Sequence, residues 1–324
     1  MERGAVYSNA DLLTWGAANA CRIGVDIVTS TDKPAVSVVV PSVGRPTRLF
    51  LTLSALCRQI TSDQFEVIVV DDSADRRTIA DVTDSLDRPL PLRTIHTGGL
   101  GAASARNAGA RAARGQLLLF LDDDTVADDL VIERHILAHS RNEVTVAHGV
   151  VIDLTAFTSA AEPVPPARRL TGLRDRHLEL EDLGNLPLAA RRLGPRRSFI
   201  ERTAQAVVAD DRYESLRWLL CIGTNTSMPR ALFEKVNGFD THYDRRWGGE
   251  DLELGLRLMA AGAQFTSIDA TAYHLPLARG DVSQVLPAFW RTVAERQGRP
   301  PLAMVGDFLC GDIPLETLAA HLST

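Results

Sequence analysis

Short apolar runs alternate with amphipathic segments through the N-terminal half of the chain. The apolar runs are bounded by polar residues, as is typical of strands buried in a sheet. They predict strands at 36–40, 65–70, 92–96 and 116–121. Segments of helical period lie between them and predict helices at 47–59, 76–86 and 102–113. Strands that alternate with helices over short links indicate βαβ units and a parallel sheet.

The pattern changes between residues 153 and 217. Five prolines interrupt this stretch, and it has three pairs of arginines, at 168–169, 191–192 and 196–197. We interpret the stretch as an inserted, partly helical excursion. Its arginines could bind an acidic acceptor or a diphosphate, but the acids among them favour a solvated surface. A periodic pattern returns from residue 219 onward and predicts a helix at 251–262.

Composition narrows the class of protein. The 324 residues are 45% apolar and carry a net charge of −6, which suits a globular protein and argues against nucleic acid as a partner. The four cysteines are scattered, as is usual for the reduced thiols of a cytoplasmic protein. No apolar stretch is long enough for a transmembrane segment, and residues 1–33 lack the pattern of a secretory signal. We therefore expect a cytoplasmic protein, with peripheral attachment to a membrane left open.

Three adjacent acids, Asp122, Asp123 and Asp124, follow the apolar run at 116–121. Ligands of open α/β sheets bind at the carboxyl ends of parallel strands. Adjacent carboxylates repel one another unless a positive charge offsets the repulsion. A divalent cation that holds a diphosphate would do so, and Mg²⁺ or Mn²⁺ suits oxygen ligands. The alternative is a solvated acidic turn that opens a helix.

A second group of candidate residues lies in the sequence Arg-Trp-Gly-Gly-Glu-Asp at 246–251. Trp247 offers a flat face for a sugar ring, and Glu250 and Asp251 could bind hydroxyls or act as a general base. Alternatively, the two acids complement the dipole of the following helix and the tryptophan belongs to the core. His274, farther along, is either a structural histidine or a metal ligand.

Taken in order, the motifs resemble those of glycosyltransferase family 2, whose members are inverting sugar-nucleotide enzymes of GT-A fold. The first four motifs are VSVVVPSVGRPTRL at 36–49, EVIVVDDS at 66–73, GAASARNAGARAARG at 101–115 and LLLFLDDDTV at 117–126. The last two are GTNTSMPRALFEKVNGFD at 223–240 and WGGEDLELGLRL at 247–258. The C-terminal half is also similar to β-1,4-galactosyltransferases, in which a comparable Trp-Gly-Gly-Glu-Asp segment contacts the acceptor sugar.

The resemblance implies an α/β protein of GT-A fold, with a central, mostly parallel sheet flanked by helices. We expect an N-terminal extension at 1–33, a catalytic domain at 34–280 and a C-terminal helical tail at 281–324. Within the catalytic domain, we expect a nucleotide-sugar half, the Arg/Pro-rich insert and an acceptor half, at 34–150, 153–217 and 219–280.

The resemblance also implies roles for residues on the donor side. Pro41 would lie against the nucleotide base, and Asp72 would accept a hydrogen bond from that base, commonly uracil. Arg106 matches a residue that is often close to the nucleotide. Asp122 or Asp123 would hold the ribose. Relatives have two acids around a neutral spacer, so the three consecutive acids leave the division of roles among them open.

The metal and the acceptor have their own candidate residues. Asp124 matches the direct metal ligand, Asp122 the other outer acid of the motif, and His274 an additional metal ligand. Asp251 matches the general base, with Glu250 orienting the acceptor. The segment that carries Trp247 and Gly249 would contact the acceptor sugar.

The function implied is that of a metal-dependent inverting glycosyltransferase. Its donor would be a nucleotide sugar, most often a UDP-sugar, and its acceptor a glycan, a lipid-linked molecule or a small natural product. One alternative is a nucleotidyltransferase, although the loop at 42–46 lacks the Gly-rich basic character that such an enzyme needs. Another is a non-catalytic carbohydrate-binding relative, which would have no need for Asp124, Glu250, Asp251 and His274 together. The glycines at 98–101 do not have the spacing of a dinucleotide-binding loop.

Overall fold

A computed structural model describes residues 33–74, 76–140, 144–154, 178, 180–244, 248–276 and 283–322. Within these ranges, nine strands form one sheet in the order β3-β2-β1-β4-β8-β6-β9-β5, and β7 pairs with β6 outside this path. The strands are β1 (Val36–Ser42), β2 (Phe65–Asp71), β3 (Leu92–His96), β4 (Leu117–Phe120), β5 (Thr125–Ala127), β6 (Thr145–Leu154), β7 (Pro195–Arg196), β8 (Thr226–Pro229) and β9 (Gln264–His274).

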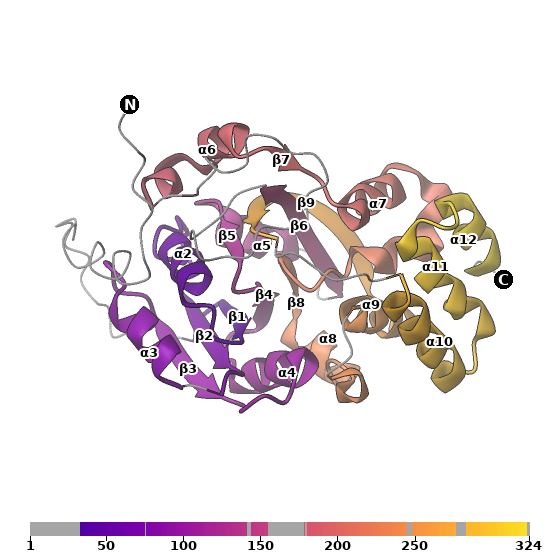
Figure 1. The fold of residues 1–324 in the computed structure, drawn as a ribbon, viewed down its shortest axis with the longest axis horizontal. Helices are drawn as coiled ribbons and strands as arrows, with labels where there is room; N and C mark the ends of the chain where they lie inside the picture. The colour runs from indigo at the N-terminus through magenta and orange to yellow at the C-terminus, as the bar shows by residue number, and fades with distance from the viewer. Residues whose placement is uncertain are drawn as a thin grey trace.

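Helices cover the sheet and fill one end of the molecule (Figure 1). The α-helices are α2 (Pro46–Leu56), α3 (Arg76–Asp84), α4 (Ala102–Ala112), α5 (Val131–His139), α6 (Leu186–Arg192), α7 (Phe199–Ala209), α8 (Arg230–Lys235), α9 (Glu250–Ala260), α10 (Val285–Gln297), α11 (Met304–Cys310) and α12 (Leu315–Leu322). Short 3₁₀ helices are η2 (Leu180–Asn185), η3 (Asp211–Leu220), η4 (Thr241–Tyr243) and η5 (Pro300–Ala303). None of the helices described is both long and apolar enough to span a bilayer.

The two faces of the sheet are packed by different helices because successive side chains of a strand point to opposite faces. In β1, Val38 and Val40 pack with residues of α2, α3 and α5. Val39 faces the other side and belongs to the core that includes α4, α9 and the C-terminal helices. Every residue of β1 except Pro41 is buried. Burial on both faces explains why this strand has an almost continuous apolar sequence.

The elements predicted for the N-terminal half are all present, and their ends fall within three residues of the predicted ones. The strands β1, β2, β3 and β4 pair in parallel, as expected. The other half of the sheet differs from the expectation of a mostly parallel sheet, because β8 is antiparallel to both β4 and β6. The chain returns to the sheet at the edge where β4 ends, so β8 starts there and runs in the opposite direction. Antiparallel neighbours need no crossover helix, and the whole sheet is therefore mixed.

The described part of the predicted insert is partly helical, with α6 and α7 joined by β7. Its two arginine pairs at 191–192 and 196–197 are exposed, in agreement with a solvated surface. The pair at 168–169 lies outside the described residues. The division of the chain into extension, catalytic domain and tail stays a prediction.

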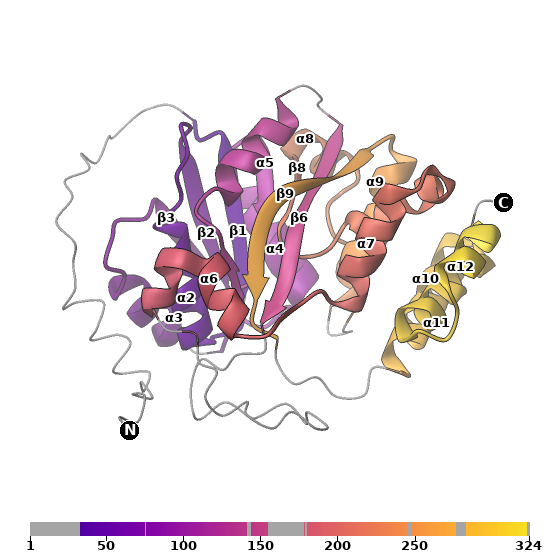
Figure 2. The same cartoon turned by 90° about the horizontal axis from the view of Figure 1, so that it is seen from above.

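The C-terminal helices form part of the main core, although their sequence carried no interpretable motif. Figure 2 shows α10, α11 and α12 together at one end of the molecule, near α7. Trp290 of α10 packs against Trp218 of η3, with ring centroids 5.8 Å apart. Phe308 of α11 packs against Phe199 of α7 at 5.2 Å. The helices after residue 283 thus support the half of the molecule that contains α9.

Candidate active site

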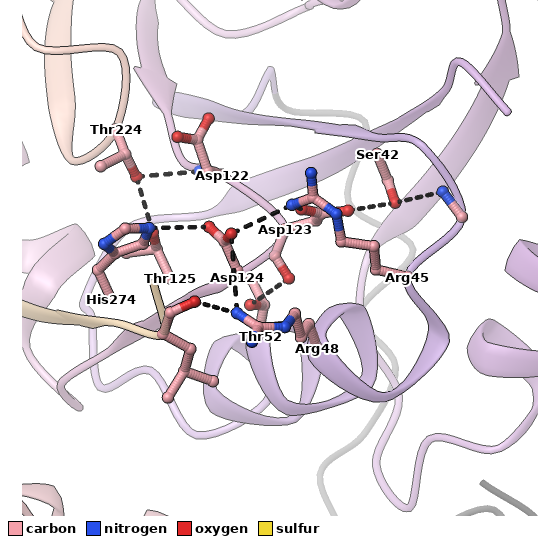
Figure 3. A network of polar contacts seen from close by, with 12 residues as sticks. Ser42, Arg45, Arg48, Thr52, Asp122, Asp123, Asp124, Thr125, Thr224 and His274 are labelled. Atoms are coloured by element: carbon pink, nitrogen blue, oxygen red, sulfur yellow. Dashed lines mark hydrogen bonds and ion pairs between the residues drawn. The ribbon is translucent and has the colours of Figure 1, made fainter. Parts of the chain in front are cut away.

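The three consecutive aspartates form the turn between β4 and β5, and their side chains have different partners. Figure 3 shows the partners of Asp123 and Asp124. Asp122 pairs with Arg106, at 2.8 Å. Asp123 accepts a hydrogen bond from Ser42 at 2.6 Å. Asp124 lies 3.5 Å from the imidazole of His274. Each of the three adjacent carboxylates thus has its own positive or polar partner, and these partners reduce the repulsion among the carboxylates.

Asp124 and His274 come together through the pairing of two strands. Thr125 of β5 lies opposite His274 of β9, and the Leu275 backbone N–H donates to the Asp124 carbonyl at 2.9 Å. On the imidazole, Nε2 faces Asp124 Oδ1 while Nδ1 lies 2.9 Å from Oδ1 of Asp153. Burial lowers the pKa of His274, but the neighbouring charges of Asp124 and Asp153 outweigh burial and raise this pKa above its ordinary value.

Asp124 and His274 fit a divalent cation as two of its ligands. Adjacent ligands of an octahedral Mg²⁺ or Mn²⁺ lie about 3 Å apart, close to the 3.5 Å between Asp124 Oδ1 and His274 Nε2. Asp153, which faces Nδ1, would leave Nε2 available to the metal, as carboxylates behind metal-binding histidines commonly do. Among the residues described, no group of three or more His, Cys, Asp or Glu side chains could hold a metal ion by itself. Water and phosphate oxygens would therefore complete the shell.

Asp123 is held by the loop that follows β1. Its carboxylate accepts from Ser42 at 2.6 Å and from Nη1 of Arg45 at 3.2 Å, and its carbonyl accepts from Thr52 of α2 at 3.0 Å. Burial, followed by the charge of Asp124, raises the pKa of Asp123 to about 7, although Arg45 and Ser42 oppose this rise. The arginine therefore stabilises a carboxylate that is costly to ionise. The role of Asp122 or Asp123 in holding ribose stays a prediction, as does metal binding by Asp122.

Arg106 forms ion pairs with acidic residues from both halves of the chain. This residue of α4 is buried, and its guanidinium contacts Asp122 at 2.8 Å and Glu250 at 3.0 Å. Burial disfavours the charged guanidinium, but Asp122 and Glu250 raise the pKa of Arg106 above its ordinary value. Its guanidinium also lies 5.4 Å from the centre of the Phe239 ring. The arginine predicted to lie near the nucleotide is thus shared by an acid after β4 and an acid at the start of α9.

Asp251 belongs to the same cluster of charges. Its carboxylate accepts hydrogen bonds from the backbone N–H groups of Gly223 at 2.7 Å and Leu252 at 2.8 Å. Burial and the charge of Glu250 raise the pKa of Asp251 to about 6, although Arg106 and the two backbone hydrogen bonds oppose the rise. A carboxylate with a raised pKa that is still ionised at neutral pH is a better proton acceptor than an ordinary one.

Asp72, which is predicted to contact the nucleotide base, anchors the Gly-rich loop that follows β3. Its carboxylate accepts from the Thr97 hydroxyl at 2.6 Å and from three backbone N–H groups, those of Gly99 at 2.9 Å, Leu100 at 2.8 Å and Gly101 at 2.9 Å. The loop is thereby fixed beside the ends of β1 and β2. A hydrogen bond from Asp72 to a nucleotide base stays a prediction.

Of three further predicted residues, the structure describes Pro41 and Gly249 but not Trp247. Pro41 lies near the end of β1, next to Val70 of β2 in the parallel register. Trp247 lies outside the described residues. Gly249, two residues later, has φ of 124°, and a Cβ added to it would come within 2.9 Å of the Phe289 ring. Helix α10 therefore packs directly against the start of α9 and requires glycine there.

Sequence reasoning missed several residues that shape the site. Arg45 and Arg48 are three positions apart at the start of α2, and this spacing could have indicated that both lie on one face of the helix. Asp153 and His274 are register partners of β6 and β9, which no local pattern reveals. Asp244, directly before the undescribed residues 245–247, accepts from the Ser104 backbone N–H of α4 at 3.1 Å. Only the fold brings the last two pairs together.

Comparison with known proteins gives a family for this arrangement. Residues 37–183 match the model of Glycosyl transferase family 2, and residues 205–277 match the model described as the N-terminal domain of galactosyltransferase. Validoxylamine A glucosyltransferase of Streptomyces hygroscopicus subsp. jinggangensis is 35% identical over 72% of this chain and 53% of its own length. Chondroitin synthase of Pasteurella multocida is 25% identical over 81% of this chain and 26% of its own length. The chain thus spans about half the length, or less, of these relatives.

A solved structure supports the same fold. The crystal structure of GalNAc-T7 with UDP, GalNAc and Mn²⁺ superposes with a TM-score of 0.52 and 14% sequence identity, and the match covers 82% of this chain and 48% of that one. At this identity the likeness concerns the fold alone, which is GT-A. The motifs, the two matching family models and the fold agree, and the chain belongs to glycosyltransferase family 2.

Proposed function

We propose that the protein is a metal-dependent inverting glycosyltransferase that moves a sugar from a UDP-sugar to an acceptor hydroxyl. The observation that carries this proposal is the contact of Arg106 with both Asp122 and Glu250. It brings the acids that follow β4 and the acids that open α9 into one cluster. In this reaction the donor sugar and the acceptor hydroxyl must be bound next to each other, and this cluster brings the residues proposed for donor and acceptor together.

The donor side of the cluster would hold the diphosphate. Asp124 and His274 would bind the cation, and Asp153 would keep Nε2 of the histidine directed toward it. When bound, Mg²⁺ or Mn²⁺ supplies a Lewis acid for the negative charge that develops on the leaving diphosphate. Arg106 would keep Asp122 and Glu250 in fixed positions while that charge develops.

On the acceptor side, Asp251 would act as the general base. The acceptor oxygen attacks the anomeric carbon from the face opposite the diphosphate while the bond from that carbon to the donor oxygen breaks, and its electron pair leaves with the diphosphate. The transition state should be oxocarbenium-like, as in glycoside chemistry generally. The acceptor proton passes to a carboxylate oxygen of Asp251. Attack from the opposite face inverts the anomeric configuration.

The names of the relatives guide the choice of substrates. Validoxylamine A glucosyltransferase supports a glucosyl donor and validoxylamine A as first compounds to test. Chondroitin synthase supports a glycan acceptor, and the UDP in the GalNAc-T7 crystals supports a uridine nucleotide. A lipid-linked acceptor belongs in the same panel. Among the described residues, Cys57, Cys221 and Cys310 form no disulfide, which supports a cytoplasmic location.

The test is transfer from a panel of nucleotide sugars, with Mn²⁺ present and then removed by a chelator. We expect release of UDP that depends on both an acceptor and the metal. NMR of the product would show whether the anomeric configuration is inverted. Calorimetry that detects no nucleotide sugar binding with Mn²⁺ present would overturn the proposal. Release of pyrophosphate from a nucleoside triphosphate would favour a nucleotidyltransferase instead.

A further inference from the structure

Arg45 lies between two of the acids that the donor would approach. It stands in the loop between β1 and α2, and the same nitrogen, Nη1, contacts Asp123 Oδ1 at 3.2 Å and Asp124 Oδ2 at 3.1 Å (Figure 3). Its side chain is 37% exposed, whereas those of the two aspartates are 5% and 9% exposed. A partly exposed cation thus contacts two buried carboxylates at the end of the sheet.

The neighbouring Arg48 is held in a different way. Its side chain is only 4% exposed, and Nη1 donates to the carbonyl of Leu275 while lying 3.9 Å from Asp124 Oδ2. A buried guanidinium that donates to a backbone carbonyl cannot move without leaving that carbonyl unpaired. Arg45, which is partly in solvent and follows Gly44 at φ 84°, can change its partner at lower cost.

The two oxygens of Asp124 face different groups. Oδ1 faces His274 Nε2 at 3.5 Å, and Oδ2 faces Arg45 at 3.1 Å. A cation bound between Asp124 and His274 would therefore share one carboxylate with Arg45. Two positive groups on a single carboxylate repel each other unless an anion lies near both of them. The diphosphate of a nucleotide sugar is such an anion, and a guanidinium binds phosphate oxygens in a two-point fork.

We propose that Arg45 has two successive partners, the carboxylates of Asp123 and Asp124 in the free protein and the donor diphosphate once the cation is bound. The inference rests on the proposed function, because it needs a diphosphate donor and a cation held by Asp124 and His274. In the free protein, Arg45 stabilises the acids and competes with the cation. In the complex, it adds a second positive group to the leaving diphosphate.

The experiment compares Arg45→Gln with wild type in two binding measurements. Mn²⁺ binding to the free protein is followed by the loss of the electron paramagnetic resonance signal of aqueous Mn²⁺. UDP binding at saturating Mn²⁺ is followed by calorimetry. We expect Mn²⁺ to bind roughly fivefold more tightly, because a competing cation has been removed. We expect UDP to bind roughly tenfold more weakly, because a charge-assisted hydrogen bond has been lost.

Arg58→Gln is the matched control. Arg58 follows the end of α2, its side chain is 29% exposed, and its Nε lies 3.4 Å from Asp129 Oδ1. The substitution removes the same charge from an ion pair that touches none of the acids of the site, so it should change neither binding constant. Arg45→Lys keeps the charge without the fork, and we expect it to restore the Mn²⁺ affinity of wild type but only part of the UDP affinity.

The outcomes separate this inference from the proposed function. Opposite changes in the Mn²⁺ and UDP affinities of Arg45→Gln support two successive partners. A UDP affinity of Arg45→Gln within twofold of wild type overturns the inference. Weaker Mn²⁺ binding by this variant also overturns it, because Arg45 would then only hold the acids in place. If wild type itself binds no UDP in the presence of Mn²⁺, the proposed function fails first.

Discussion

Replacement of Asp251 by asparagine gives the sharpest test of the acceptor side. The side chain keeps its size but loses its charge and its ability to accept a proton. Loss of a positioned general base typically costs roughly 10²- to 10⁴-fold in rate. UDP binding should be almost unchanged, because the hydrogen bonds described for Asp251 are with the backbone N–H groups of Gly223 and Leu252 and not with the acids that follow β4.

The same substitution should alter the pH dependence of stability. The pKa of Asp251 rises from 3.8 to about 6 on folding, chiefly through burial and then through the charge of Glu250. Each unit corresponds to about 1.4 kcal/mol, so ionisation of this carboxyl destabilises the folded protein by about 2 to 3 kcal/mol. Because the pKa is raised, the stabilising contribution is complete below the unfolded value of 3.8 and is lost as the pH rises through about 6.

The asparagine variant has no such charge and should escape this loss. Asparagine has one acceptor oxygen for two backbone donors, and leaving a buried donor unpaired costs about 1 to 3 kcal/mol at any pH. The protonated carboxyl of wild type at low pH has a similar shortage of acceptors. We therefore expect the stability of Asp251→Asn relative to wild type to improve by about 2 kcal/mol between about pH 4 and pH 7.5.

Three measurements check these expectations. Urea unfolding across the pH range gives the stability difference, transfer assays give the rate, and calorimetry gives UDP affinity. The transfer rate of wild type should fall at acidic pH with an apparent pKa near 6. Asp269→Asn is the control, because the side chain of Asp269 is 89% exposed and its loss should change none of the three. Equal loss of transfer and UDP binding, or a stability difference that is flat with pH, would refute the role of Asp251.

Other predictions concern the metal site and Gly249. Asp124→Ala should weaken Mn²⁺-dependent UDP binding by roughly tenfold or more, since a direct ligand is lost, and unchanged Mn²⁺ affinity by paramagnetic resonance would contradict this. Asp153→Ala should lower Mn²⁺ affinity by roughly 10- to 100-fold, because His274 Nδ1 loses the partner that orients the ring. Asp153 itself would not contact the cation. Gly249→Ala should destabilise the protein by about 1 to 3 kcal/mol in urea unfolding, because φ is 124° and a Cβ would lie 2.9 Å from Phe289. Wild-type stability in that variant would show that α10 can move away.

The sequence predicted the N-terminal half of the fold because its strands are buried on both faces. Such strands have continuous apolar sequences, and amphipathic helices between them leave few arrangements other than a parallel sheet. The acids that follow β2 and β4 could be assigned to one edge for the same reason, since the carboxyl ends of parallel strands meet there. Strand direction in the C-terminal half could not be predicted, because the irregular insert that precedes β8 does not restrict the direction in which the chain re-enters the sheet.

The partner of each candidate residue was decided only by the tertiary structure. Asp122, Asp123 and Asp124 are adjacent in sequence, yet a turn directs their side chains toward Arg106, Ser42 and His274, respectively. The sequence by itself determined which carboxylates lie at the ends of strands, because burial and periodicity are local properties. The pairing of each carboxylate with a cation or donor as many as 150 residues away depends on strand order and register, and these follow from packing of the whole chain.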